Sequence, residues 1–272
     1  MSRTIDSVVQ QYREYLAQNH HKHFTAFDAR MRTDVEAATT EAVVYFVLGR
    51  ISNNVNIFED PVAGGPDFQC SLGAQFCLVE ATCLHISALE KASGISNTFV
   101  EGAQSFAPLT TRIFGKVFDK TARDQLRGLQ DPLILCIGSQ HIHTSLLMGR
   151  QAAATFLTGD PLITFPINDP NSDVSLMTPL KNSLFFRLNT LGELESCRRS
   201  VSAILLLSIG NVEVEVVGIR HPDPEYQLSS DLLTSIPFVY IKKWPPTHGH
   251  FEIDWTVPNA VEDSSQSAHF KY

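Results

Sequence analysis

The chain has 272 residues, of which 43% are hydrophobic and 18% are charged, and its formal net charge is −8. This length and composition predict a folded protein with one large core or two small ones, and they exclude an intrinsically disordered chain. Because proteins that coat nucleic acid non-specifically are usually basic, any contact of this acidic chain with a polyanion has to be local.

The sequence carries no sign of membrane insertion or export. No apolar run approaches the roughly 20 residues that a membrane-spanning helix needs, and residues 1–6 lack the apolar core of a signal peptide. The five cysteines show no zinc-ribbon spacing, and an odd number fits reduced thiols in a core. We therefore expect a cytoplasmic protein with no membrane partner.

Apolar spacing predicts two helices near the N-terminus. The first should run from Ile5 to Leu16, because apolar residues recur there at helical spacing. A polar loop with three histidines, residues 20–23, should follow it. The second helix should begin near Thr33-Asp34, where Asp34 is a suitable cap, and should run to Gly49.

The second helix contains one acid in an apolar setting. Its interior is almost entirely apolar, so we expect it to be buried, and Glu41 stands next to the run from Ala42 to Val44. An isolated buried charge is costly, so an inward-pointing Glu41 would need a partner or a cation. The alternative is a place on the wet edge of the helix beside Thr40.

A first strand or strand entry is predicted at Ile51–Ile57. The next two predicted strands each carry an acid at what should be the same end. Gly64-Gly65-Pro66 is a turn signal, and Asp67 directly after it should begin a strand. The run from Phe76 to Val79 is too apolar for an exposed edge, so Glu80 should emerge at the lip of a buried strand. If the strands pair as a hairpin, the two carboxylates form a candidate divalent-cation site. Taken singly, Asp67 would be a turn residue and Glu80 a salt-bridge partner.

A helix with a basic face should follow, after a partly helical crossing from Leu84 to Thr98. It should run from about Thr111 to Leu129 with an apolar side toward the core. The basic stripe on its polar face consists of Lys116, Lys120, Arg123 and Arg127. Such a stripe would hold phosphates locally, which is compatible with an acidic chain.

The remaining elements complete an α/β pattern. A doubly covered strand is predicted at Leu133–Gly138, and a helix from Thr144 to Leu157 should end at Gly159. Three further strands are predicted at Leu184–Leu188, Val201–Ile209 and Val212–Ile219. We expect a mixed sheet whose first three strands are antiparallel and whose fourth is added through a helical crossover. One domain should cover residues 1–262, with a core at about 33–159, a C-terminal β elaboration at about 160–262 and a flexible tail at 263–272.

The order of these features resembles the PD-(D/E)XK nuclease superfamily. An acid in a buried first helix, Pro66-Asp67 at the start of a strand, Glu80 at the end of the next, and then a helix and an apolar strand follow the pattern of that family from about Thr33 to Gly159. The resemblance implies a restriction endonuclease-like mixed β-sheet flanked by helices, here with additional C-terminal strands. It also implies that Asp67 and Glu80 bind one or two Mg²⁺ or Mn²⁺ ions, with Glu41 as a third acidic ligand and the backbone carbonyl of Ala81 completing the site.

The chain departs from the family at one motif position. The lysine that usually stands two residues after the second acid is Thr82 here. In the family that lysine orients or deprotonates the attacking water, so its loss affects turnover more than metal binding. Some members place the positive group on the following helix, which makes Lys120 and Arg123 the first candidates and Lys116 the next. Only a lysine among them could act as a base, because arginine stays charged.

Three hypotheses follow from these residues. The first is a metal-dependent endonuclease of defence or repair, with DNA favoured over RNA, in which Asp67, Glu80 and Lys120 are catalytic. Gln125 resembles a polar residue that several nuclease branches carry on the same helix, and it would join the basic stripe in binding nucleic acid. The second is a catalytically inactive relative that binds nucleic acid or protein, and the third is an unrelated α/β protein with structural acids. Cutting both strands of a duplex with one site per chain would favour a homodimer.

Overall fold

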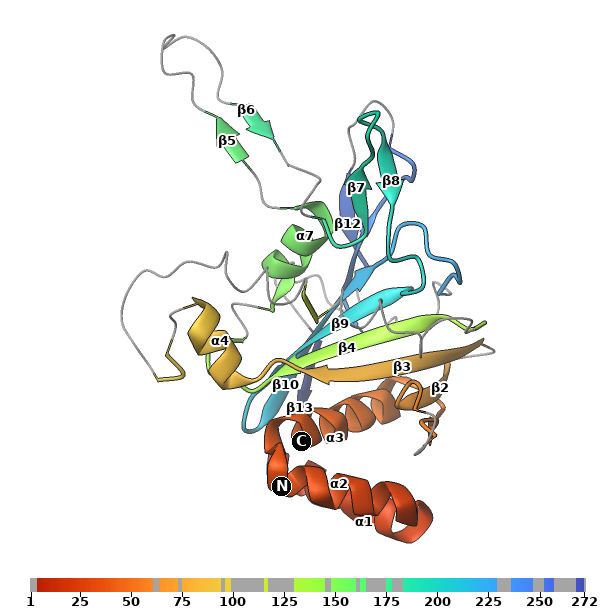
Figure 1. Cartoon of the computed structure of the whole chain (residues 1–272), viewed down its shortest axis with the longest axis vertical. Helices are drawn as coiled ribbons and strands as arrows, with labels where there is room; N and C mark the ends of the chain where they lie inside the picture. Colours follow the sequence, from red (N-terminus) through yellow and green to blue (C-terminus); the bar gives the residue numbers. More distant parts are fainter. Residues whose placement is uncertain are drawn as a thin grey trace.

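The chain folds around one large mixed β-sheet with helices on both faces, so the α/β prediction is confirmed (Figure 1). The computed structural model describes residues 4–60, 64–72, 75–93, 96–98, 115–116, 130–144, 148–159, 162–164, 175–177, 183–228, 236–246, 252–256 and 268–271. The helices are α1 (Ile5–Asn19), α2 (His21–Thr33), α3 (Val35–Ile51), α4 (Ile86–Ser93) and α7 (Arg150–Thr158). No helix in these ranges is both long and apolar enough to cross a bilayer.

The main sheet has the order β1-β2-β3-β4-β9-β10-β11-β12, with β13 paired to β10. Its strands are β1 (Asn54–Ile57), β2 (Phe68–Leu72), β3 (Gln75–Cys83), β4 (Leu133–Ser139), β9 (Ala203–Ile209), β10 (Glu213–Arg220), β11 (Phe238–Ile241), β12 (Ile253–Trp255) and β13 (Ala268–Lys271). The strands β1, β2 and β3 form an antiparallel meander, and β4 joins β3 in parallel. This is the predicted strand arrangement, and β9 extends it because it pairs in parallel with β4.

The two faces of the sheet bury separate apolar clusters. One cluster joins α1 and α3 to the side chains of β3 and β4 that point toward them, including Val79 and Ile134. The other joins α4 and α7 to the alternate side chains of the same strands, including Leu78 and Leu135. Because β4 and β9 are buried at every position, they are central strands covered on both faces.

Helix α3 begins where the sequence predicts. The Asp34 side chain accepts a hydrogen bond from the backbone N–H of Ala37 at 3.0 Å, which caps the helix N-terminus. The apolar residues from Ala42 to Val44 are buried against the sheet. The Asp34 cap and the buried apolar residues together determine which face of α3 lies against the ends of the strands.

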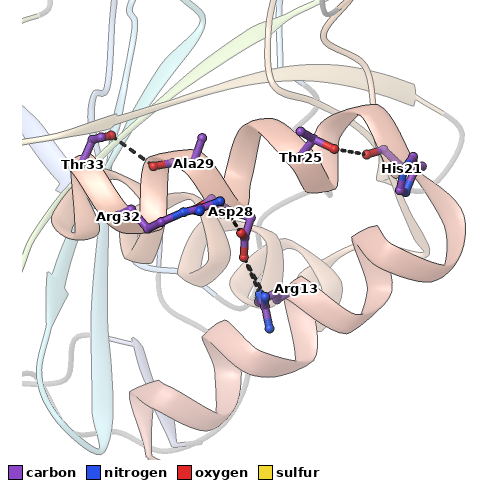
Figure 2. A network of polar contacts seen from close by, with 7 residues as sticks. All are labelled: Arg13, His21, Thr25, Asp28, Ala29, Arg32 and Thr33. Atoms are coloured by element: carbon purple, nitrogen blue, oxygen red, sulfur yellow. Dashed lines mark hydrogen bonds and ion pairs between the residues drawn. The ribbon is translucent and has the colours of Figure 1, made fainter.

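The expected polar loop at residues 20–23 is wrong, because His21 begins α2. The helix forms since Phe24, Phe27 and Met31 lie on one face and pack on the core, with Phe27 fully buried. An ion-pair network then holds α2 on α1: two nitrogens of Arg13 donate to Oδ1 of Asp28 at 2.9 and 2.7 Å, and Arg32 donates to Oδ2 at 2.7 Å (Figure 2). The packing of α2 matters for the site, because Arg30 lies on it.

The C-terminal third differs from the prediction in two places. The strand expected at Leu184–Leu188 is shorter in the structure: it is β7 (Phe186–Leu188), which pairs with β8 (Leu194–Ser196) as a separate two-stranded sheet. A second small hairpin is formed by β5 (Leu162–Thr164) and β6 (Ser175–Met177). Within the expected tail, Ala268–Lys271 form β13 and pair with β10, so that part of the tail is a strand.

Candidate functional site

A cavity of about 350 Å³ lies where the ends of β2 and β3 meet α3. Its lining is mostly polar and combines carboxylates, cationic side chains and backbone from five segments of the chain. The lining residues are Arg30, Asp34, Ala37, Glu41, Glu59, Gly65, Asp67, Glu80, Ala81, Thr82, Cys83, His85 and Lys116. The spacing of Asp34, Ala37 and Glu41 places these three on one face of α3, which is why the helix presents them together.

Strand register brings Asp67 and Glu80 to the same place. The ladder between β2 and β3 pairs Phe68 with Val79, and one more step along it sets Asp67 opposite Glu80. Residues that face each other across an antiparallel pair point to the same side of the sheet. Both side chains line the cavity, so the convergence that the sequence predicts is found in the structure.

The end of β2 leaves a backbone gap that Asp67 fills. Because β2 begins at Phe68, the N–H of Ala81 has no strand residue opposite it, and Oδ2 of Asp67 accepts its hydrogen bond at 2.6 Å. In an antiparallel ladder the N–H and C=O of one residue face the same neighbour. The carbonyl oxygen of Ala81 therefore faces the same gap as the Asp67 carboxylate.

The carboxylates make this corner of the cavity electrostatically unfavourable for a negative charge. Burial and then the charges of Glu80 and Glu41 raise the pKa of Asp67 well above its ordinary value, although the hydrogen bond from Ala81 acts in the opposite direction. Glu80 is itself buried. A cation placed between the carboxylates would relieve this repulsion.

Glu41 already has two partners. The Arg30 guanidinium pairs with Oε2, and the hydroxyl of Tyr12 donates to Oε1 at 3.0 Å. Burial raises the pKa of Glu41, and Arg30 and Tyr12 only partly offset this effect. Glu41 thus points inward, as one of the two sequence interpretations has it, and its partner in this structure is Arg30.

A histidine–carboxylate pair occupies another part of the wall. Nε2 of His85 lies 3.0 Å from each carboxylate oxygen of Asp34. Burial acts to raise the pKa of Asp34, but hydrogen bonds from Ala37 and His85 and the charge of Arg30 outweigh it and leave the pKa below its ordinary value. The capping residue of α3 is therefore an ionised carboxylate that holds the His85 ring.

Lys116 brings a positive charge to the same wall. Burial raises the pKa of the Cys83 thiol to about 12, with the charges of Glu36 and Asp34 adding to the rise and that of Lys116 opposing it. Lys116 is therefore close enough to this region to act on Cys83. Thr82, which stands in the position of the family lysine, also lines the cavity and is buried.

The structure brings together most of the predicted site. Glu41, Asp67, Glu80, Ala81 and Lys116 share one cavity. The other three predicted residues, Lys120, Arg123 and Gln125, lie outside the described residues, and so does Arg127 of the basic stripe.

Sequence reasoning missed Arg30, Asp34 and His85 as members of the cavity wall. A signal for His85 exists, since it stands two residues after β3, which is parallel to β4, and ligands gather at that end of parallel strands. Arg30 could not be placed because no helix was predicted between the loop at residues 20–23 and Thr33. Asp34 was interpreted only as a helix cap.

Two carboxylates and a backbone carbonyl are the part of this wall that could hold a metal ion. In the described part of the chain, no three or more His, Cys, Asp or Glu side chains are arranged to hold one between them. Mg²⁺ does not need such a cage, because it is commonly bound by one or two carboxylates, retained waters and substrate phosphates. Asp67, Glu80 and the carbonyl of Ala81 fit that pattern.

Comparisons with protein-family models, with curated proteins and with solved structures found no match for this chain.

Proposed function

We propose that the chain is a divalent-metal-dependent phosphodiesterase that cleaves nucleic acid, with DNA favoured over RNA, on a restriction endonuclease-like fold. Support for the fold comes from the order of its elements: α3, the antiparallel strands β1 to β3, and then β4 parallel to β3. This is the order in which the PD-(D/E)XK resemblance would place them. The strands from β9 onward are additions to that core.

The observation that carries the proposal is the meeting of Asp67 and Glu80 at the end of β2 and β3. Burial and the negative charge of Glu80 both raise the pKa of Asp67 and so make its ionisation harder. A protein that keeps two acids side by side in a partly buried place accepts a cost in stability. Metal binding gives a reason for that cost.

The role of each residue follows from its chemistry. Asp67, Glu80 and the Ala81 carbonyl would hold Mg²⁺ or Mn²⁺, because hard oxygen ligands suit these ions. When bound, the ion polarises a phosphodiester and makes a water molecule more acidic. Lys116, at the cavity wall, supplies positive charge for a phosphate. The predicted roles of Lys120, Arg123 and Gln125 stay part of the proposal.

A second candidate function is a nucleic-acid or protein binding module without turnover. Thr82 favours it, because a buried hydroxyl replaces the lysine that serves catalysis in the nuclease family. The two functions differ in one observable: a binding module loses nothing catalytic when Asp67 is changed.

The test compares the parent chain with Asp67→Asn and Glu80→Gln in cleavage of plasmid and of labelled single-stranded and duplex oligonucleotides. The proposal expects cleavage that requires Mg²⁺ or Mn²⁺, stops with EDTA and is lost in both variants. Glu195→Gln, an exposed position on β8 outside the cavity, is the matched control and should cleave like the parent. Nucleic-acid binding without cleavage in parent and variants alike would instead support the binding module. A chain that cuts two strands with one site each should also sediment as a dimer.

A further inference from the structure

In the described part of the cavity wall, Thr82 stands at the position where the nuclease family has its lysine. The Thr82 hydroxyl does not accept a proton at neutral pH, and the Arg30 guanidinium stays charged. Burial keeps the Cys83 thiol protonated, because it raises the pKa to about 12. Glu41 already forms an ion pair with Arg30 and accepts a hydrogen bond from Tyr12. These side chains can therefore be set aside as proton acceptors.

His85 lines the same cavity and has the carboxylate partner that orients a histidine base. Its Nε2 lies 3.0 Å from both oxygens of Asp34, and the low pKa of Asp34 keeps that carboxylate ionised. An ionised carboxylate accepts from an N–H, so the neutral ring carries its hydrogen on Nε2 and presents Nδ1 as the acceptor. The His85 side chain is 35% exposed, so water reaches it.

The position of Asp34 is itself fixed. The same side chain caps α3 through Ala37, so the carboxylate that orients His85 cannot rotate away without opening the first turn of the helix. His85 is in turn fixed by its backbone, because its carbonyl accepts from the N–H groups of Ala88 and Leu89 at the start of α4. The pair thus links two helix N-termini on the cavity wall.

We propose that His85, oriented by Asp34, accepts the proton of the attacking water in phosphodiester hydrolysis. This inference rests on the proposed function. As the water oxygen forms its bond to phosphorus, its proton passes to Nδ1 of His85. The bond from phosphorus to the leaving oxygen breaks with its electron pair, and that oxygen takes a proton from solvent. Asp34 is a positioning residue, because it acts through the His85 ring.

Charged groups on the neighbouring elements surround His85. Asp34 and Glu36 face His85 from α3, where Glu36 accepts a hydrogen bond from the N–H of Ile86 at 2.7 Å. Arg30 from α2 and Lys116 lie on the same cavity wall. Two acidic and two basic side chains therefore lie around the proposed base.

The experiment measures cleavage of bis(p-nitrophenyl) phosphate by the full chain with Mg²⁺ or Mn²⁺. The leaving group of this substrate needs no proton, so the rate reports on the base and not on a general acid. His85→Ala should lower kcat by about a hundredfold or more with little change in KM, since positioned bases contribute about 10²–10⁴-fold. The rate should fall more toward low pH in the parent than in this variant, in which protonation of Asp67 still weakens metal binding. Added imidazole should restore part of the rate.

Three matched variants sharpen the result. Asp34→Asn keeps the helix cap, because asparagine caps as well as aspartate, yet it should lower kcat and weaken the pH dependence. Lys116→Met should lower the rate while keeping the low-pH decline. His21→Ala, on the exposed face of α2, should behave like the parent.

Ring ¹⁵N chemical shifts give a readout that does not depend on activity. At pH 8 the parent should show His85 with hydrogen on Nε2, and Asp34→Asn should lose this preference. If the parent cleaves but His85→Ala keeps both rate and pH dependence, the inference is wrong and the proposed function stands. If the parent does not cleave with any metal, both fail together. A ring hydrogen on Nδ1 in the parent would also overturn the inference.

Discussion

Replacing Asp67 by asparagine should make the metal-free protein more stable. Burial and the charges of Glu80 and Glu41 raise the pKa of Asp67, so ionising it at pH 7 costs folding free energy. Asparagine is nearly the same size, and its side-chain oxygen can still accept the 2.6 Å hydrogen bond from Ala81. The variant therefore removes the charge and keeps the contact.

The pKa shift of Asp67 limits how much the free energy of unfolding can rise. A shift of one pKa unit is worth about 1.4 kcal/mol, and at pH 7 the cost cannot exceed the interval between pH 7 and the unfolded carboxyl pKa of about 3.9, which is about 4 kcal/mol. We expect the free energy of unfolding to rise by about 1–4 kcal/mol. For a chain of this size each kcal/mol raises Tm by about 2–4 °C.

Urea unfolding in EDTA at several pH values measures this gain. A raised folded-state pKa contributes stability that is fully present below the unfolded pKa and is lost as pH rises toward the folded pKa. The advantage of Asp67→Asn should therefore be largest at pH 7 and shrink as pH falls toward 4. Asp28→Asn is a control of opposite sign, because Arg13 lowers the pKa of Asp28 (Figure 2). A less stable Asp67→Asn at pH 7, or an advantage that grows toward low pH, would refute the reasoning.

The other predictions also concern the stability of the folded chain. Arg30→Met leaves Glu41 buried without its cation. Because Arg30 is 38% exposed, we expect the free energy of unfolding to fall by about 1–3 kcal/mol, less than for a fully buried pair. Adding Glu41→Gln should restore most of this stability, as measured by urea unfolding. Gly218→Ala would set a Cβ 2.2 Å from the Phe238 ring and should cost about 1–3 kcal/mol by calorimetry, whereas Gly49→Ala meets no atom within 4 Å and should be neutral or stabilising. Equal effects of the two glycine changes would contradict the packing described.

Local signals made much of the fold predictable. Asp34 is a strong helix cap followed by an apolar run, and the structure begins α3 there. The apolar stretch at the start of β4 has no polar alternation, which marks a strand covered on both faces, and every residue of β4 is buried. Helix α2 was missed because its surface is rich in histidine and arginine and only Phe27 is fully buried. Its formation depends on packing against α1.

Part of the candidate site could likewise be predicted from local sequence, and part could not. Asp67 and Glu80 could be paired from the sequence, because hairpin register depends on local pattern and turn position. Pairing Arg30 with Glu41 required knowing that α2 packs beside α3. The contact of His85 with Asp34 joins residues 51 positions apart through the packing of β3 on α3. Such contacts arise from tertiary structure, and no short sequence pattern encodes them.

The most direct measurement is an anomalous difference map from a crystal soaked in Mn²⁺. The account predicts a peak bridging the carboxylates of Asp67 and Glu80, with oxygen ligands at about 2.1 Å and the Ala81 carbonyl among them. The peak should disappear in Asp67→Asn crystals soaked in the same way. Manganese bound only at other carboxylates, with Asp67 and Glu80 left without it, would contradict the account.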